Sequence, residues 1–506
     1  MAQATVLPQP RVWRPPWYVL IVLGLAALAA LHERAPWLLH GHWLFVTGVG
    51  LAAVLLLAAA LWELPVAGIM CAAIALTIFS GNWGSLGLPG FPFLPDRILI
   101  VFALLALALH APGAAGLPKP RVRNVHLLLA ATVLYTVASA AAAGTLGNEA
   151  AIFDLLDRLG AIPFLMLLIA PVVFAGPRER DLLLATLVGL GAYLGVTALF
   201  ETIGPHGLVF PRYIAASDAL RLVAQPGGPF REPISEGFAC FACGTAAAIA
   251  CWKWRGRRRY LAAAVLGLSA LGAFLTLERG VWIAAAAAVA AAALAAPELR
   301  RWLLPGVAVC ALLIGGALIV FPAIAGHASA RAADQTSVWD RQNQTATAMR
   351  MIQARPLFGF GWDNYENVSL GYFRQAPSYP MTGYADSGTL LPLHDTYLSN
   401  AVELGLLGVM LWIACLCWGL GGAIFSSGPE DLRPWKLGLL ALAVFFCVLA
   451  GFDPLQQNFT QLLLWTWAGL CMAGLPASAD RRPDVRVSRV RKPDTGQAST
   501  VAVVVR

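Results

Sequence analysis

The chain has 506 residues, of which 59% are hydrophobic and only 12% are charged, and its formal net charge is +8. Apolar runs long enough to cross a membrane recur from one end to the other, which excludes a soluble globular protein and predicts an all-α polytopic membrane protein. The basic residues cluster in short segments between these runs and in the C-terminal tail. The positive charge therefore reflects membrane orientation and does not indicate a nucleic-acid partner.

Apolar runs separated by Pro, Gly and charged residues predict about 12–14 transmembrane helices. The runs at 97–110, 161–175 and 281–296 are short or follow closely on a neighbour, so they decide where the count falls in that range. The predicted spans cover residues 17–31, 42–61, 63–80, 97–110, 125–143, 161–175, 181–200, 234–251, 260–277, 281–296, 303–325, 396–425, 436–451 and 461–475.

If the N-terminus is cytoplasmic, roughly two thirds of the Lys and Arg residues fall on the cytoplasmic side, as the positive-inside rule requires. Both termini are then cytoplasmic. The resulting segments are an N-terminus (1–16), a bundle of about 11 spans (17–325) with a smaller outer loop (201–233), a large, partly helical outer loop (326–395), C-terminal transmembrane helices (396–475) and a disordered basic tail (476–506).

The large outer loop contains one predicted helix, at residues 337–352. Its apolar face is expected to consist of Trp339, Ala346, Met349 and Ile352. The helix should end at Pro356, where a turn rich in glycine and aromatic residues begins. Loops of this length are usually functional or disordered, and the aromatic and glycine content favours an ordered loop.

Two arginines on the outer side could bind an anion. Arg279 lies at the end of a span, where a charge is costly unless it is paired, reaches the interface or faces an aqueous cavity. It could be a local anchor with Glu278, or it could line a cavity and grip a phosphate-like ligand. Arg341, beside Asp340 on the predicted loop helix, could belong to a solvated face or bind the same ligand.

His394 stands just ahead of an apolar helix, at a predicted membrane boundary where a histidine can exchange a proton. Taken alone, a histidine at the edge of a span more often has no catalytic or ligand-binding role. Asp395 could orient its ring, and Glu403 could bond to Asn400 or serve a function, because acids inside spans are functional candidates. No histidine shows a metal-ligand spacing with a carboxylate, so we expect no metal and no cofactor.

Three motifs carry a resemblance to a known family. The pattern His394-x3-Leu398-x4-Glu403-x-Gly405-x2-Gly408 resembles the signature of the O-antigen ligase and polymerase family, membrane glycosyltransferases that act on undecaprenyl-pyrophosphate-linked glycans. Arg279-Gly280-x-Trp282 is similar to the family's arginine at a periplasmic helix end. Trp339-x-Arg341, followed by RPLFGFG at 355–361, is similar to its loop helix and turn. The resemblance covers about 275–410, and Asp395 departs from it where Asn often follows the histidine.

The resemblance implies a glycosyltransferase of the bacterial inner membrane with its active site on the periplasmic face. It would transfer an oligo- or polysaccharide from undecaprenyl pyrophosphate to an acceptor hydroxyl, with inversion and without a metal. Arg279 and Arg341 would clamp the pyrophosphate and His394 would accept or orient the hydroxyl proton, while Glu403, Gly405 and Gly408 support the site. The acceptor would be lipid A-core in a ligase or a lipid-linked repeat unit in a polymerase, and the span count and basic outer loops lean slightly towards polymerase.

A polysaccharide-precursor flippase or another multispan transporter is the alternative, because many spans with intramembrane charge also describe transporters. The charged residues gather at the outer surface, however, and the long outer loop suits an active site there. Formation of a glycosidic bond by the purified protein would distinguish the two.

Overall fold

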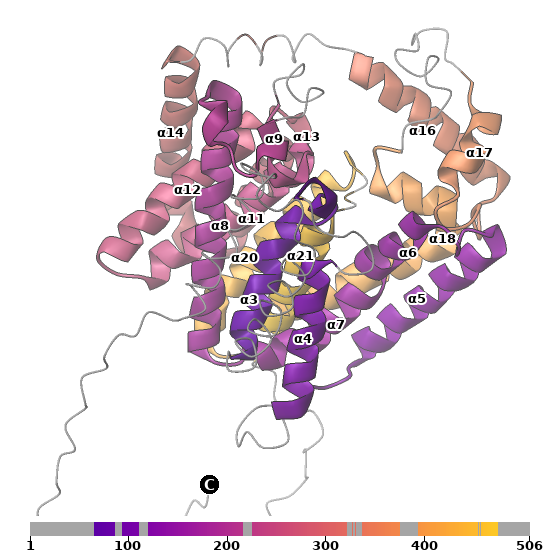
Figure 1. The fold of residues 1–506 in the computed structure, drawn as a ribbon, viewed down its shortest axis with the longest axis horizontal. Coiled ribbons are helices and arrows are strands. Elements are labelled where there is room, and N and C mark those ends of the chain that lie inside the picture. The colour runs from indigo at the N-terminus through magenta and orange to yellow at the C-terminus, as the bar shows by residue number, and fades with distance from the viewer. Residues whose placement is uncertain are drawn as a thin grey trace, which may run out of the picture. The chain divides into compact units, whose positions relative to one another are not determined.

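The computed structural model describes residues 65–86, 94–110, 120–215, 225–320, 336–374, 393–453 and 457–473, with Gly326, Ser329 and Leu455. Throughout these residues the regular structure is helical, and they contain no strand (Figure 1). The all-α polytopic membrane fold predicted from the sequence is confirmed. The predicted segment 1–16, the spans at 17–31 and 42–61, and the tail at 476–506 lie outside the described residues.

Every other predicted span coincides with a helix. These helices are α3 (Val66–Leu76), α4 (Pro95–His110), α5 (Asn124–Ala143), α7 (Ala161–Val173), α8 (Pro177–Ile203), α11 (Pro233–Lys253), α12 (Arg257–Leu275), α13 (Arg279–Ala295), α14 (Pro297–Val320), α18 (Thr396–Leu416), α20 (Arg433–Leu449) and α21 (Asn458–Cys471). Among the described residues, seven helices are long and apolar enough to cross a membrane, and three shorter apolar helices accompany them. The span count of 12–14 stays a prediction.

The predicted span at 161–175 is longer in the structure than its apolar run. The short helix α6 (Glu149–Asp154) and a π-helical turn, η4 (Leu155–Leu159), precede α7, and together they extend the apolar helix to residues 151–173. A π-helical turn inserts an extra residue and redirects the side chains around it, and such turns are frequent at functional sites.

The helix α21 lies at the centre of the bundle, where it packs against α7, α11 and α20. All of its residues after Asn458 are buried, as expected of a helix that is apolar on every side. The indole N–H of Trp467 donates to the carbonyl of Trp435 at 2.8 Å, which links α21 to α20. This core supports the other helices of the bundle.

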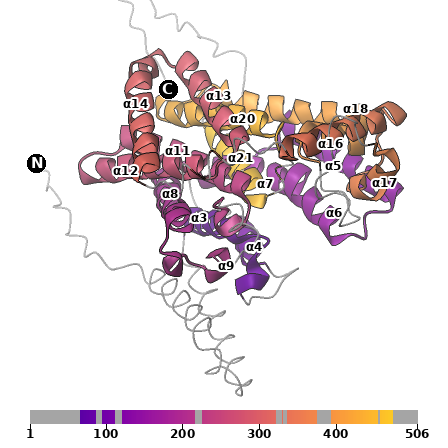
Figure 2. The same cartoon turned by 90° about the horizontal axis from the view of Figure 1, so that it is seen from above.

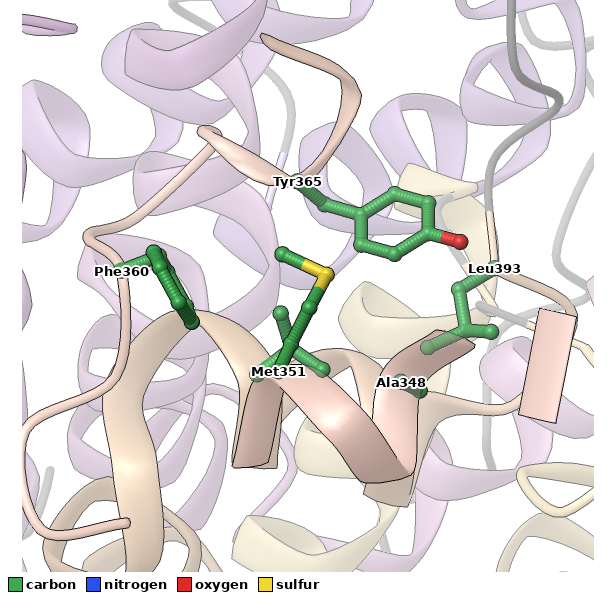
Figure 3. Close-up of a cluster of buried hydrophobic side chains, with 6 residues drawn as sticks. Ala348, Met351, Phe360, Tyr365 and Leu393 are labelled. Atoms are coloured by element: carbon green, nitrogen blue, oxygen red, sulfur yellow. The ribbon is translucent and has the colours of Figure 1, made fainter. Parts of the chain in front are cut away.

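The predicted outer loop contains an arm of two helices, α16 (Thr336–Ala354) and α17 (Tyr365–Tyr372), that lies beside α18 in both views (Figures 1 and 2). Its core is a cluster of buried side chains between α16, the following turn and the start of α18 (Figure 3). The members are Ala348, Met351, Phe360, Tyr365, Leu393 and Val402. Burying each of the larger side chains contributes about 1.5–3 kcal/mol, so the arm is an ordered part of the fold.

The helix predicted at 337–352 is confirmed as α16, but its predicted apolar face is only partly right, because Ile352 packs against the buried cluster and Met349 does not. Met349 is 45% exposed, whereas Asn343, Gln344 and Thr347 are buried. Amide and hydroxyl groups can be buried where they find hydrogen-bond partners, and hydrophobic periodicity does not anticipate this. The buried face of α16 is therefore partly polar.

The helix α18 is interrupted at Gly405. The sequence predicted an uninterrupted span at 396–425. Gly405 adopts φ 68° and ψ −174°, which is not helical. The turn after α16 fills the interruption: the N–H groups of Phe360 and Gly361 donate to the carbonyls of Val402 and Glu403, both at 2.9 Å. Backbone hydrogen bonds thus fasten the arm to α18.

Gly359 makes this close approach possible, and replacing it with alanine should detach the arm. It has φ +68°, and a Cβ atom there would lie 2.4 Å from the carbonyl oxygen of Glu403. The left-handed backbone and the clash together should lower the free energy of unfolding by about 2–5 kcal/mol in Gly359→Ala. Thermal unfolding in detergent measures this loss.

The matched control is Gly371→Ala in α17, where a Cβ atom would meet nothing within 4 Å. This substitution should leave the unfolding midpoint unchanged or slightly raised, because alanine favours a helix. Equal midpoints for the two variants would contradict the close approach at Gly359.

Candidate functional site

The first turn of α18 is fixed to residues 450–453, which follow α20. Thr396 makes two hydrogen bonds to this segment. Its N–H donates to the carbonyl of Ala450, and its hydroxyl donates to the carbonyl of Asp453, each at 2.7 Å. His394 precedes this turn and is half-buried. The histidine is therefore held at a defined place beside segment 450–453.

Asp395 caps α18. Its side chain accepts a hydrogen bond from the N–H of Leu398 at 3.0 Å, which satisfies one of the free N–H groups at a helix start. Burial raises the pKa of this carboxyl, and the N–H groups of Leu398 and Tyr397 lower it in part. Asp395 thus has a structural role as the cap of α18, which an asparagine side chain could also fill. Its expected orientation of the His394 ring stays a prediction.

The polar face of α16 brings Arg341 towards His394. The backbone N–H of His394 donates to the side-chain oxygen of Gln344 at 3.5 Å, and Gln344 is buried. Arg341 lies three residues before Gln344, so both side chains project from the same face of the helix. The half-buried Arg341 is therefore one helical turn from the contact with His394.

Asp453 is a buried acid at this site that sequence reasoning missed. Burial raises its pKa well above the usual range, and the negative charge of Glu232 raises it further, whereas the Arg341 guanidinium lowers it. Glu278, the residue before Arg279, also acts on it. Its position in the short segment between two spans, on the predicted outer side, was the signal that could have identified it.

Arg279 is the first residue of α13 and is exposed. The next residue, Gly280, lets the start of α13 approach Phe452, since a Cβ atom there would lie 3.0 Å from the Phe452 side chain. The carboxylate of Glu278 is buried and accepts a hydrogen bond from Gln225 at 3.1 Å. The start of α13 thus borders segment 450–453 as well.

The structure therefore brings the starts of α13 and α18 to one segment, 450–453, and it places Arg341 of α16 within electrostatic reach of Asp453 in that segment. With them come Arg279, His394 and Arg341, all of which retain exposed surface. Two guanidinium groups can bind an anion with several oxygens, and a partly exposed imidazole can accept a proton. Across the described residues, no group of three or more His, Cys, Asp or Glu side chains is placed to hold a metal ion.

Glu403 lies apart from these three residues. It follows His394 by about 13 Å along α18, is buried, and has Arg158 as its strongest charged neighbour. Gly405 provides the interruption of α18, and Gly408 lies against Tyr135 of α5, whose ring would be 3.1 Å from a Cβ atom. Gly405 thus admits the turn of the arm and Gly408 admits α5, and the role in supporting the site expected for Glu403, Gly405 and Gly408 stays a prediction.

The raised pKa of Asp453 predicts a pH-dependent stability. Between the unfolded value near 4 and the higher folded value, the folded state retains a proton that the unfolded state releases. The free energy of unfolding should therefore fall as pH rises through this window, by up to about 1.4 kcal/mol per pH unit from this group. Asp453→Asn keeps the shape without titrating, so thermal unfolding between pH 5 and pH 8 should show a shallower fall.

Glu430→Gln, at an exposed position before α20, serves as the control and should keep the wild-type slope. If Asp453→Asn also kept that slope, the carboxyl of Asp453 would not be the buried titrating group.

Comparison with known proteins gives two matches. Residues 263–413 match a family described as O-antigen ligase. An O-antigen ligase of Salmonella typhimurium (strain LT2) is 28% identical over 220 residues, which cover 41% of this chain and 51% of that protein. The chain thus aligns with about half the length of this relative, and no solved structure matches it. The resemblance carried by the three motifs is confirmed.

Proposed function

We propose, because residues 263–413 carry an O-antigen ligase domain, that the protein is a membrane glycosyltransferase of surface-polysaccharide assembly. It would transfer an oligo- or polysaccharide from undecaprenyl pyrophosphate to an acceptor hydroxyl. The observation that carries the proposal is that the start of α13 with Arg279 and the start of α18 just after His394 both border segment 450–453, with Arg341 of α16 in electrostatic reach of it.

The reaction needs charge stabilisation at one end and proton removal at the other. The acceptor oxygen attacks the anomeric carbon while the bond from that carbon to the pyrophosphate oxygen breaks, and the bonding electrons leave with the pyrophosphate. Arg279 and Arg341 would bind the departing pyrophosphate, where fixed positive charge stabilises the developing negative charge. His394 would accept the proton of the hydroxyl.

Asp453 would line the site near Arg341, whose guanidinium lowers the pKa of that carboxyl. Attack from the side opposite the leaving group inverts the anomeric configuration, as in other single-displacement glycosyl reactions. The two arginines supply the positive charge in this scheme, so it requires no metal.

The proposed site faces the periplasm of the bacterial inner membrane. The positive-inside rule places both termini in the cytoplasm, and with that orientation the starts of α13 and α18, the arm and segment 450–453 all fall on the outer side. A lipid-linked glycan presented at that surface could reach all of them.

Two acceptors remain for this reaction: lipid A-core for a ligase, and a second lipid-linked repeat unit for a polymerase. The matched relative and family are described as O-antigen ligase, whereas the basic outer loops lean slightly towards polymerase. Product analysis in a deletion strain separates them. Loss of a ligase should leave polymer on the carrier lipid, and loss of a polymerase should leave single repeat units.

A further inference from the structure

The turn between α16 and α17 is anchored at a second place besides α18. Trp362 is 1% exposed, its indole N–H donates to the carbonyl of Ala151 at 3.2 Å, and its own carbonyl accepts from the hydroxyl of Thr145 at 2.7 Å. Gly361, with φ +104°, lies so close to α5 that a Cβ atom would be 2.2 Å from the Cβ of Ala143. The turn is thus wedged between the interruption of α18 and the α5–α6 connection.

One buried arginine lies at this junction and contacts both α6 and the turn. Arg158 lies on the π-helical turn η4 and is 7% exposed. Its Nη1 atom bonds Asp154 Oδ2 at 2.7 Å, and its guanidinium carbon lies 5.3 Å from the centre of the Trp362 ring. It is also the strongest charged neighbour of Glu403 on α18, and its charge acts on Asp363 in the turn.

The acid next to Arg158 in the sequence has a different partner. Asp157, also on η4, pairs with Arg97 of α4 at 2.6 Å. The guanidinium of Arg158 instead bonds Asp154 and covers the Trp362 ring, two contacts that a planar fork can make at the same time.

We propose that Arg158 is a positioning residue for the transfer reaction. By covering the Trp362 ring while bonded to α6, and by placing its charge near Glu403 of α18, it fixes the turn that follows α16, and α16 carries Arg341 and Gln344 to His394. Arg158 would contact neither the lipid-linked glycan donor nor the acceptor. The expected effect of Arg158 on the reaction rate rests on the proposed function. Its anchoring of the turn can be measured without any enzyme activity.

Hydrogen exchange in the full-length protein tests the anchoring. In Arg158→Met, the amides of Phe360 and Gly361, which bond to α18, should exchange at least about tenfold faster than in wild type. Arg158→Lys keeps the charge but loses the fork and should fall between. The control is Arg180→Met: Arg180 is also buried, but bonds the carbonyls of Phe174 and Ala175 and pairs with Asp431. It should leave exchange in the turn unchanged.

A double-mutant cycle tests the positioning. Arg158→Met should lower kcat/KM about tenfold in wild type but less than about threefold when Arg341 is already lysine, because residues acting as a unit are not additive. Unchanged exchange at Phe360 and Gly361 would overturn the inference, and so would additive losses despite faster exchange. If wild type itself formed no glycosidic bond, the proposed function would fail, and the exchange result would still decide whether Arg158 anchors the arm.

Discussion

His394→Gln is expected to lower kcat by about 10²–10⁴, the range that a positioned acid or base contributes. Glutamine can still occupy the half-buried position before α18, but it cannot accept a proton near neutral pH. Because the arginines that would bind the donor are unchanged, KM for the lipid-linked glycan should change little. Initial rates with the purified protein and a defined acceptor measure both parameters.

The control for this substitution is His206→Gln, at an exposed position in the smaller of the two predicted outer loops. It should retain wild-type rates. A His394→Gln protein that unfolds at the wild-type temperature and transfers glycan at the wild-type rate would remove His394 from the mechanism.

Arg279→Gln and Arg341→Gln should each lower kcat/KM by about 10²–10³, the loss found when one preorganised donor to a developing negative charge is removed. Both variants should also bind inorganic pyrophosphate more weakly in a calorimetric titration, a result that does not depend on turnover. Lysine at either position should recover part of the loss, because it restores the charge but not the planar fork.

Arg350→Gln is the matched control on the same helix as Arg341. Its guanidinium donates to the carbonyl of Tyr372 at 3.1 Å within the arm, and segment 450–453 plays no part in that contact. Pyrophosphate affinity should therefore stay at the wild-type value. Wild-type affinity in both Arg279→Gln and Arg341→Gln would contradict a pyrophosphate clamp.

Hydropathy and short motifs predicted much of this architecture. The described helices follow the predicted spans because each apolar run must satisfy its own backbone polar groups to lie in a bilayer. The resemblance carried by the motifs around Arg279, Arg341 and His394 is also confirmed. Their catalytic roles stay predictions.

The remaining features depend on contacts between distant parts of the chain. The polar buried face of α16 exists because partners such as His394 supply hydrogen bonds. The interruption at Gly405 is occupied by a turn that the sequence presents as a separate motif. Asp453 and Arg158 have unremarkable local sequences, and only the packing of the chain brings them to Arg341 and Glu403. The pattern of apolar residues within one segment carries no information on which distant residues will lie near each other.

The most direct measurement is a reconstituted transfer assay that follows bond formation and carrier movement together. Purified protein in vesicles is incubated with an undecaprenyl-pyrophosphate glycan and, in parallel reactions, with lipid A-core or with a second lipid-linked repeat unit. We predict a new glycosidic product with at least one acceptor, released pyrophosphate carrier, and a rate of product formation about 10²–10⁴ lower with His394→Gln. Reorientation of the lipid carrier without any new glycosidic bond would contradict a glycosyltransferase and identify a transporter.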